Sequence, residues 1–252
     1  MYCYIYDIFT NQKKYEKQLA KVELLLADLG IGGKIYKLNV LKNLETIIEE
    51  AIAEGAKTIV AVGNDQTVSK IVNLIVDKNI TLGIIPVGDG CLLAESLGIN
   101  SSEAAVQILS ARRLKKLDVG KINEQYFLLA LESADKDIVF DLKDYNINPR
   151  ENNEAVGLYN INISNYQFKS NPEDGIMEAV FVPRAKKAWQ NFWLKKGKNL
   201  PERISVFPIK ELTINHKKKP LTINIDRQRT TKTPARVEIL KNKLKIVASK
   251  TI

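Results

Sequence analysis

The stretch Thr58-Ile59-Val60-Ala61-Val62-Gly63-Asn64-Asp65-Gln66-Thr67 decides the fold class. Its first half is a short apolar run, which is typical of a strand buried on both faces of a parallel sheet. Polar residues follow at once, and Thr67 is suited to cap a helix. The apolar residues of that helix recur at helical spacing: Val68, Ile71, Val72 and Ile75. The stretch therefore predicts a strand–turn–helix junction.

A second junction of the same kind follows in the chain. Residues 82–85 read as a buried strand, residues 86–90 as a loop, and a helix is expected through Leu97. Because carboxyl ends of parallel strands share one edge of a sheet, we expect both turns to lie where open α/β sheets bind ligands. N–H groups at a helix N-terminus favour an anion such as phosphate there. Two ordinary βα turns, with glycines at positive φ, are the alternative interpretation.

Strand and helix signals alternate through the first half of the chain and then stop. Residues 2–6 and 33–38 read as strands, and Asn11 is expected to cap a helix that runs to Leu29. After about Leu131, short strand-like runs dominate, at 137–142, 155–164, 177–182, 204–207, 210–215, 221–225 and 235–247. This predicts an α/β domain with a parallel sheet over residues 1–131 and a β-sandwich domain over residues 132–252. The last residues could return to the first domain.

Composition excludes several classes of protein. Of the 252 residues, 45% are hydrophobic, which is too high for a disordered chain. No apolar run reaches the roughly 20 residues that span a bilayer, and no signal peptide is visible. Two cysteines are too few for a disulfide scaffold, so a reduced, cytoplasmic protein is expected.

The positive charge is concentrated at the end of the chain. Residues 183–252 hold 19 basic and 4 acidic side chains, a net charge of +15. Such a block suggests an anionic partner, namely phosphate, nucleic acid or an acidic membrane surface. Solubility accounts equally well for most of these lysines. A helical stretch, residues 185–196, carries Trp189 and Trp193 four residues apart, for packing or for a membrane interface.

Two acidic positions in the second half could carry chemistry. The turn Asn171-Pro172-Glu173-Asp174-Gly175-Ile176 could bind a hard cation or could be a plain hairpin turn. Asp226 could be a general base or a carboxylate in a salt bridge. His216 is the only histidine, and it is expected to be a solvated loop residue beside three lysines.

These segments, in this order, resemble the diacylglycerol kinase catalytic-domain family, whose wider superfamily includes sphingosine kinases, NAD kinases and 6-phosphofructokinases. The best match runs from Lys57 to Leu131 and includes Leu117-Asp118-Val119-Gly120. The resemblance implies an ATP-binding α/β domain followed by a β-sandwich, with the site in the cleft between them.

The resemblance also implies site residues in the first domain. The family's phosphate loop reads Gly-Gly-Asp-Gly-Thr, and here Asn64 and Gln66 replace two of its glycines. In the second loop Asp89 replaces a threonine and puts a negative charge where nucleotide phosphate is expected. The first strand leads into Asp7 without the family's Asn-Pro-x-Ser-Gly. The implied ATP-binding residues are Gly63, Asn64, Asp65, Gln66, Thr67, Gly88 and Asp89.

In the second domain the resemblance implies a metal site and a catalytic group. Asp174 and the carbonyl of Ile176 would be ligands of a structural Mg²⁺ ion. Asp226 matches the aspartate that is linked in the family to deprotonating the lipid hydroxyl. The family's nearby glutamate is Gln228 here, which cannot act as a base.

Two functions remain open at this point. The first is a lipid kinase that transfers a phosphoryl group from ATP, with Mg²⁺, to a lipid hydroxyl, in the cytoplasm or peripherally at an anionic membrane. The second is a catalytically inactive member that binds nucleotide, phosphate or lipid, which the replacements at Asn64, Gln66, Asp89 and Gln228 favour. Nucleic-acid binding ranks last, because no aromatic platform or recognition helix supports it. A homodimer is kept open.

Overall fold

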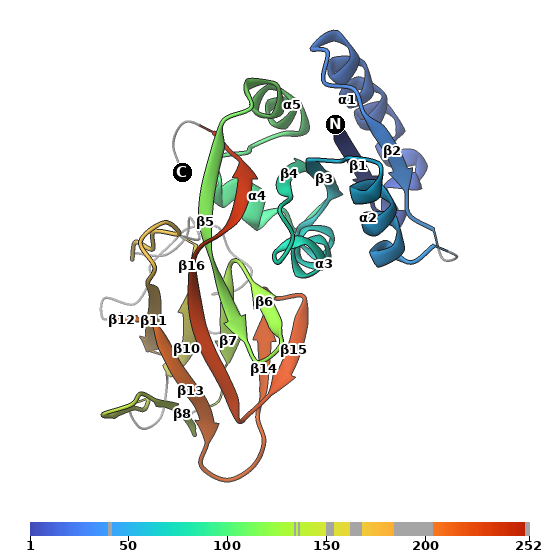
Figure 1. The fold of residues 1–252 in the computed structure, drawn as a ribbon. Coiled ribbons are helices and arrows are strands. Elements are labelled where there is room, and N and C mark those ends of the chain that lie inside the picture. The colour runs from blue at the N-terminus through green and yellow to red at the C-terminus, as the bar shows by residue number, and fades with distance from the viewer. Residues whose placement is uncertain are drawn as a thin grey trace. The chain divides into compact units, whose positions relative to one another are not determined.

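The computed structural model of the chain describes residues 1–39, 42–133, 135, 137–149, 154–161, 168–183 and 204–249. It forms two compact units (Figure 1). The first consists of Met1–Leu117 and the chain from Lys243 onward, and the second of Asp118–Asn242. The division at Leu117 falls within a single strand, β5 (Leu114–Ile122). The domain boundary near Leu131 stays a prediction. The helix expected over residues 185–196 lies outside the described residues.

A parallel sheet forms the centre of the first unit. Its strands, in spatial order, are β2 (Lys34–Lys37), β1 (Tyr2–Tyr6), β3 (Thr58–Gly63), β4 (Thr81–Pro86) and the end of β16 (Ala235–Val247). Residues 59–62 of β3 are fully buried, as expected for a strand covered on both faces. The N-terminal α/β domain with a parallel sheet is confirmed.

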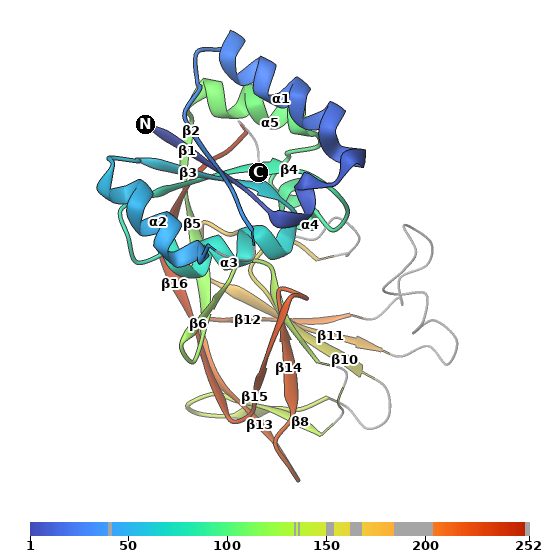
Figure 2. The ribbon, with the colours of Figure 1, turned by 90° about the vertical axis from the view of Figure 1, so that its right-hand side faces the viewer.

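Helices cover both faces of this sheet. They are α1 (Glu16–Asp28), α2 (Leu44–Ala53), α3 (Asp65–Ile75), α4 (Leu92–Ser96) and α5 (Ser102–Ala111). Figure 2 shows α1 and α5 together on one face and α2 and α3 together on the other. None of the helices in the described part of the chain is long and apolar enough to cross a membrane.

Two predicted helix caps are wrong. Asn11 ends a 3-10 turn, η1 (Ile8–Asn11), and a second turn, η2 (Lys13–Tyr15), precedes α1. Helix α3 begins at Asp65, so Asn64 is its N-cap and Thr67 lies in its first turn. An asparagine and a threonine three residues apart are both good caps, so the sequence pattern alone does not separate them.

Two antiparallel sheets enclose the core of the second unit. One sheet has the order β12 (Ser205–Ile209), β11 (Met177–Pro183), β10 (Glu154–Tyr159), β7 (Ala130–Ser133), β14 (Thr222–Ile225) and β15 (Arg229–Lys232). The other contains β16, β13 (Glu211–His216), β8 (Ile138–Asp141) and β9 (Asn146–Ile147), with β5 (Leu114–Ile122) and β6 (Gln125–Phe127) beside it. Apolar residues of both sheets form one buried cluster, so the predicted sandwich is confirmed.

Candidate functional site

The carboxyl edge of the parallel sheet gathers three chain segments. In the register of β3 and β4, Gly63 is paired with Pro86, and in that of β1 and β3, Tyr6 is paired with Val62. The segments that follow β1, β3 and β4 therefore start side by side. The chain leaves β1 for β2 on one side and β3 for β4 on the other, so this edge is a topological switch point. The expectation that the two predicted turns share an edge is confirmed.

Asp65 joins the loop after β3 to the loop after β4. Its carboxylate accepts the backbone N–H groups of Leu92 (2.9 Å) and Leu93 (3.0 Å), at the start of α4. Its own backbone N–H donates to the carbonyl of Gly90 (2.9 Å). The residue is only 5% exposed, so its carboxylate is directed into the protein. Asp65 thus fixes the position of one loop against the other.

Asn64 occupies the amide groups that a phosphate would need. Its Oδ1 accepts the backbone N–H of Gln66 (3.1 Å) and, at 3.4 Å, that of Thr67. Because the N–H of Asp65 is also donated to Gly90, three amides at the start of α3 have partners within the chain. An anion can bind at this helix terminus only if it displaces the Asn64 side chain.

Asp7 and Thr67 are linked within the same edge. The Thr67 hydroxyl donates to Asp7 Oδ2 (2.8 Å), and Asp7 also accepts the backbone N–H of Phe9 (3.4 Å) as the cap of η1. Both residues are buried. A side chain at Gly63 would overlap the Thr67 hydroxyl, so only glycine allows this approach. The family motifs imply no role for Asp7. Its position directly after a buried strand is the sequence signal that indicates a site residue.

Aromatic rings lie against the second loop. Gly88 adopts φ +81°, and a Cβ atom there would lie 3.0 Å from both Phe9 Cε2 and Tyr15 Oη. The two rings pack edge to face, with centroids 5.6 Å apart. Burial raises the pKa of the nearby Cys91 thiol to about 11. Asp89 and Gln66, in contrast, are exposed. The loop is therefore closed on its Gly88 side and negatively charged at its tip.

Asp226, in the second unit, is enclosed by backbone amides. Its carboxylate accepts the N–H groups of Leu128 (3.1 Å), Leu129 (2.8 Å) and Ala130 (3.1 Å), and only 4% of the residue is exposed. Burial raises the pKa of Asp226 to about 6, although these three hydrogen bonds lower it in part. A pKa near neutrality suits a general base, but both oxygens already hold protein donors.

The residue after Asp226 combines a left-handed backbone with a paired side chain. Arg227 adopts a left-handed φ of 58°. Its guanidinium holds the Glu132 carboxylate through two hydrogen bonds of 3.0 Å, and the Tyr159 hydroxyl donates to the same carboxylate at 3.1 Å. A bidentate pair of this kind, partly buried, offsets the cost of the left-handed backbone.

Two oxygens of Asp174 accept hydrogen bonds within the turn region. Asp174 Oδ1 accepts the backbone N–H of Ile176 (2.9 Å), and the Asp174 carbonyl accepts a hydrogen bond from Lys241 Nζ (3.2 Å). Mg²⁺ prefers an octahedron of oxygens, and a neighbouring ammonium group opposes a second cation. These contacts use Asp174 Oδ1 and the Asp174 carbonyl. The Mg²⁺ site expected at the Asp174 carboxylate and the Ile176 carbonyl stays a prediction.

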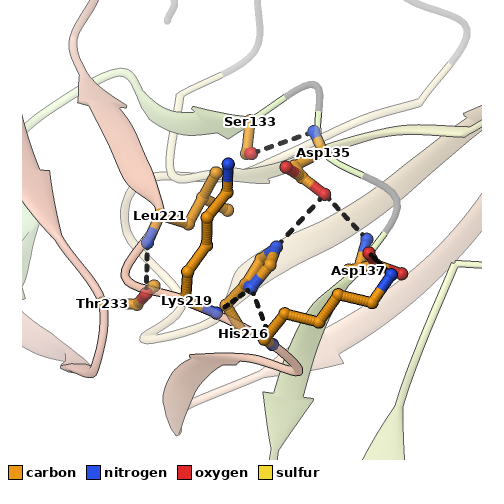
Figure 3. A network of polar contacts seen from close by, with 8 residues as sticks. Ser133, Asp135, Asp137, His216, Lys219, Leu221 and Thr233 are labelled. Atoms are coloured by element: carbon orange, nitrogen blue, oxygen red, sulfur yellow. Dashed lines mark hydrogen bonds and ion pairs between the residues drawn. The ribbon is translucent and has the colours of Figure 1, made fainter.

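A second cluster, Asp135, Asp137 and His216, brings three potential metal ligands within 4.8 Å of one another. Figure 3 shows His216 between Asp135 and the backbone that follows it. His216 Nδ1 accepts the N–H groups of Lys218 (3.1 Å) and Lys219 (3.0 Å), so it carries no proton.

In the neutral ring the proton is therefore on Nε2, which lies 3.4 Å from Asp135 Oδ1. A histidine that binds a metal normally donates its other N–H, which His216 cannot do, so this cluster does not fit a metal ion. The His216 side chain is 2% exposed, and the expectation of a solvated residue is wrong.

Comparisons with known proteins agree with the motif analysis. Residues 2–122 match the family model for the diacylglycerol kinase catalytic domain. Diacylglycerol kinases of Staphylococcus aureus strains bovine RF122 / ET3-1 and MRSA252 are each 26% identical over 127 residues, which is 49% of this chain and 40% of theirs. The predicted family resemblance is confirmed, and the chain matches less than half the length of these relatives.

A crystal structure of a diacylglycerol kinase from Bacillus anthracis str. Sterne has a similar fold. It superposes with a TM-score of 0.75 over 99% of this chain and 97% of its own, at 20% sequence identity. This likeness confirms the two-domain fold class.

The exchange Asp226→Asn tests how much the backbone N–H groups around the Asp226 carboxylate contribute to the stability of the fold. The NH₂ group of the new side chain would face at least one backbone N–H, so we expect a loss of about 1–3 kcal/mol in the free energy of unfolding. Urea denaturation measures it, and the exposed Asp89→Asn exchange is the control, expected to change stability by less than about 0.5 kcal/mol. Equal stabilities of the two variants would show that the cradle contributes nothing.

Glu178 on β11 predicts a pH dependence of stability. Burial, with a smaller contribution from the Asp174 carboxylate, raises the pKa of Glu178 to about 7. The folded state then holds a proton that the unfolded state releases near pH 4.5, so stability falls as pH rises from about 4.5 to 7. We expect Glu178→Gln to raise the melting temperature by several degrees more at about pH 8 than at about pH 5. A difference that is the same at both pH values would contradict this.

Proposed function

We propose that this chain, whose residues 2–122 match the diacylglycerol kinase catalytic-domain family, transfers the γ-phosphoryl group of ATP to a lipid hydroxyl. The observation that carries the proposal is the pair of loops after β3 and β4, which Asp65 holds together at the carboxyl edge of the sheet. Phosphoryl transfer depends mainly on positioning and charge neutralisation, so loops in a fixed relative position suit this chemistry.

In this proposal ATP binds by exchange with the Asn64 side chain. A phosphate oxygen takes the place of Asn64 Oδ1 at the N–H groups of Gln66 and Thr67. Hydrogen bonds to an anion are roughly twice as strong as those to a neutral amide, and the dipole of α3 adds to the attraction. Mg²⁺ would arrive with ATP and offset the negative charge of Asp89. Asp226 would take the hydroxyl proton, which requires it to release part of its amide cradle.

The second candidate is a family member that binds nucleotide, phosphate or lipid without transfer. Three features favour it: Asn64 already occupies the amides, Asp226 is enclosed, and Gln228 stands where the family has an acid. Both candidates use the same sheet edge. They differ only in whether a phosphoryl group reaches an acceptor.

An anionic membrane surface is the proposed location of the acceptor. The net charge of +15 in residues 183–252 supports it, since each Lys or Arg near an anionic bilayer contributes about 1 kcal/mol of attraction. A peripheral, cytoplasmic protein follows from this proposal. A homodimer stays a prediction.

Asn64 variants test the nucleotide site directly. Asn64→Gly frees the two amides and destabilises the helix start by only a few tenths of a kcal/mol, so we expect Mg·ATP to bind at least about tenfold more tightly than to the wild type. Asn64→Asp keeps the cap and adds a negative charge, so it should bind more weakly than the wild type. Isothermal titration calorimetry measures all three proteins. Equal affinities would exclude this loop as the phosphate site.

A transfer assay then separates the two candidates. Radiolabelled γ-phosphate ATP is incubated with the full chain and diacylglycerol in mixed micelles that contain an anionic lipid. Label in the extracted lipid, lost in Asn64→Asp, supports the kinase. ATP binding without labelled lipid supports the binding module, and the absence of both overturns the kinase and the nucleotide-binding form of the second candidate.

A further inference from the structure

We propose that Arg227 is a positioning residue for Asp226, and that it acts through the Glu132 carboxylate on β7. This inference rests on the proposed function, in which Asp226 takes the proton of the acceptor hydroxyl. Arg227 acts on the backbone instead of on the substrate. Its guanidinium keeps the turn that carries Asp226 in one conformation, so that the Asp226 carboxylate stays in one place.

Asp226 and Arg227 form a tight turn between β14 and β15 with an uncommon backbone. Both have left-handed φ angles, 50° and 58°, and the N–H of Gln228 donates to the carbonyl of Ile225 (2.9 Å) across them. Two consecutive residues of this kind are usually Gly, Asn or Asp, because other side chains crowd the backbone there. Asp226 fits this preference and Arg227 does not. An interaction of the Arg227 side chain must therefore offset the cost of its backbone.

Strand β7 receives both residues of the turn. The N–H of Asp226 donates to the Ala130 carbonyl (2.8 Å), and the Ala130 N–H donates to the Asp226 carboxylate (3.1 Å). Two residues further along β7, the Glu132 carboxylate accepts two hydrogen bonds from Arg227, from Nε and from Nη2, both of 3.0 Å. Because the turn is attached to one strand at two points, it has little freedom to rotate Asp226 away from Ala130.

Glu132 is itself held in place. Only 5% of the residue is exposed, and the Tyr159 hydroxyl on β10 donates to its Oε1 (3.1 Å). The Tyr159 ring packs against Phe168, with ring centroids 5.1 Å apart. Breaking a buried ion pair leaves an unpaired charge in the interior, which is strongly unfavourable. Glu132 is therefore a fixed point to which Arg227 can tie the turn.

Two replacements of Arg227 test the proposal. Both Arg227→Ala and Arg227→Gly remove the guanidinium, but only glycine takes up a left-handed φ without strain. The readout is hydrogen–deuterium exchange, followed by NMR, of the N–H groups of residues 128–130, which donate to the Asp226 carboxylate. Amides of β13, in the opposite sheet, report any general loss of stability. Relative to them, we expect exchange at residues 128–130 to be at least about tenfold faster in Arg227→Ala than in the wild type, and less accelerated in Arg227→Gly.

Arg236→Ala is the matched control, because Arg236 forms an exposed ion pair with Glu211 (3.4 Å) in the same unit. It should leave exchange at residues 128–130 unchanged, since an exposed pair contributes little. If Arg227→Ala exchanges no faster there than Arg236→Ala does, the proposal is overturned. This measurement needs neither ATP nor lipid, so its outcome is distinguishable from a failure of the kinase assay.

The transfer assay adds a readout that general destabilisation does not produce. We expect Arg227→Ala to lower kcat about tenfold and to leave the KM for Mg·ATP unchanged, because only the group that takes the proton is displaced. Arg227→Gly should recover part of kcat. An active Arg227→Ala enzyme with the kcat of the wild type would overturn the proposal.

Discussion

A buried carboxylate that holds backbone N–H groups of a distant segment is the interaction on which the candidate site depends. Asp65 is the principal case, because it carries the first two amides of α4 and so fixes the loop after β4. Without it, buried donors would lose their partners, at about 1–3 kcal/mol for each group. The relative position of the two loops would then no longer be determined.

The second unit uses the same device twice. Asp118 holds Gly175 and Asn242, and Asp226 holds the three residues that lead into β7. Motif comparison associates Asp65 and Asp226 with nucleotide and proton chemistry. In this structure both carboxylates accept backbone N–H groups. Chemistry at either position would therefore start from a carboxylate that already has hydrogen-bond donors.

The sequence predicts the elements well and the site only in part. The apolar runs at 58–62 and 82–85 become β3 and β4, because burial on both faces leaves little choice of residue. Short strands such as β6 and β15 carry no period to detect. The capping role of Asn64 depends on where α3 begins, which local pattern does not settle. The His216 side chain is buried despite three following lysines, because the backbone N–H groups of Lys218 and Lys219 face its ring.

The central claim is that the amides at the start of α3, held by Asn64, form the nucleotide site. Amide ¹H–¹⁵N NMR during a titration with Mg·ATP tests it most directly. We expect the signals of Gln66 and Thr67 to shift first and furthest, as Asn64 Oδ1 gives way to a phosphate oxygen. Saturable binding that leaves both signals in place and perturbs other residues would contradict it.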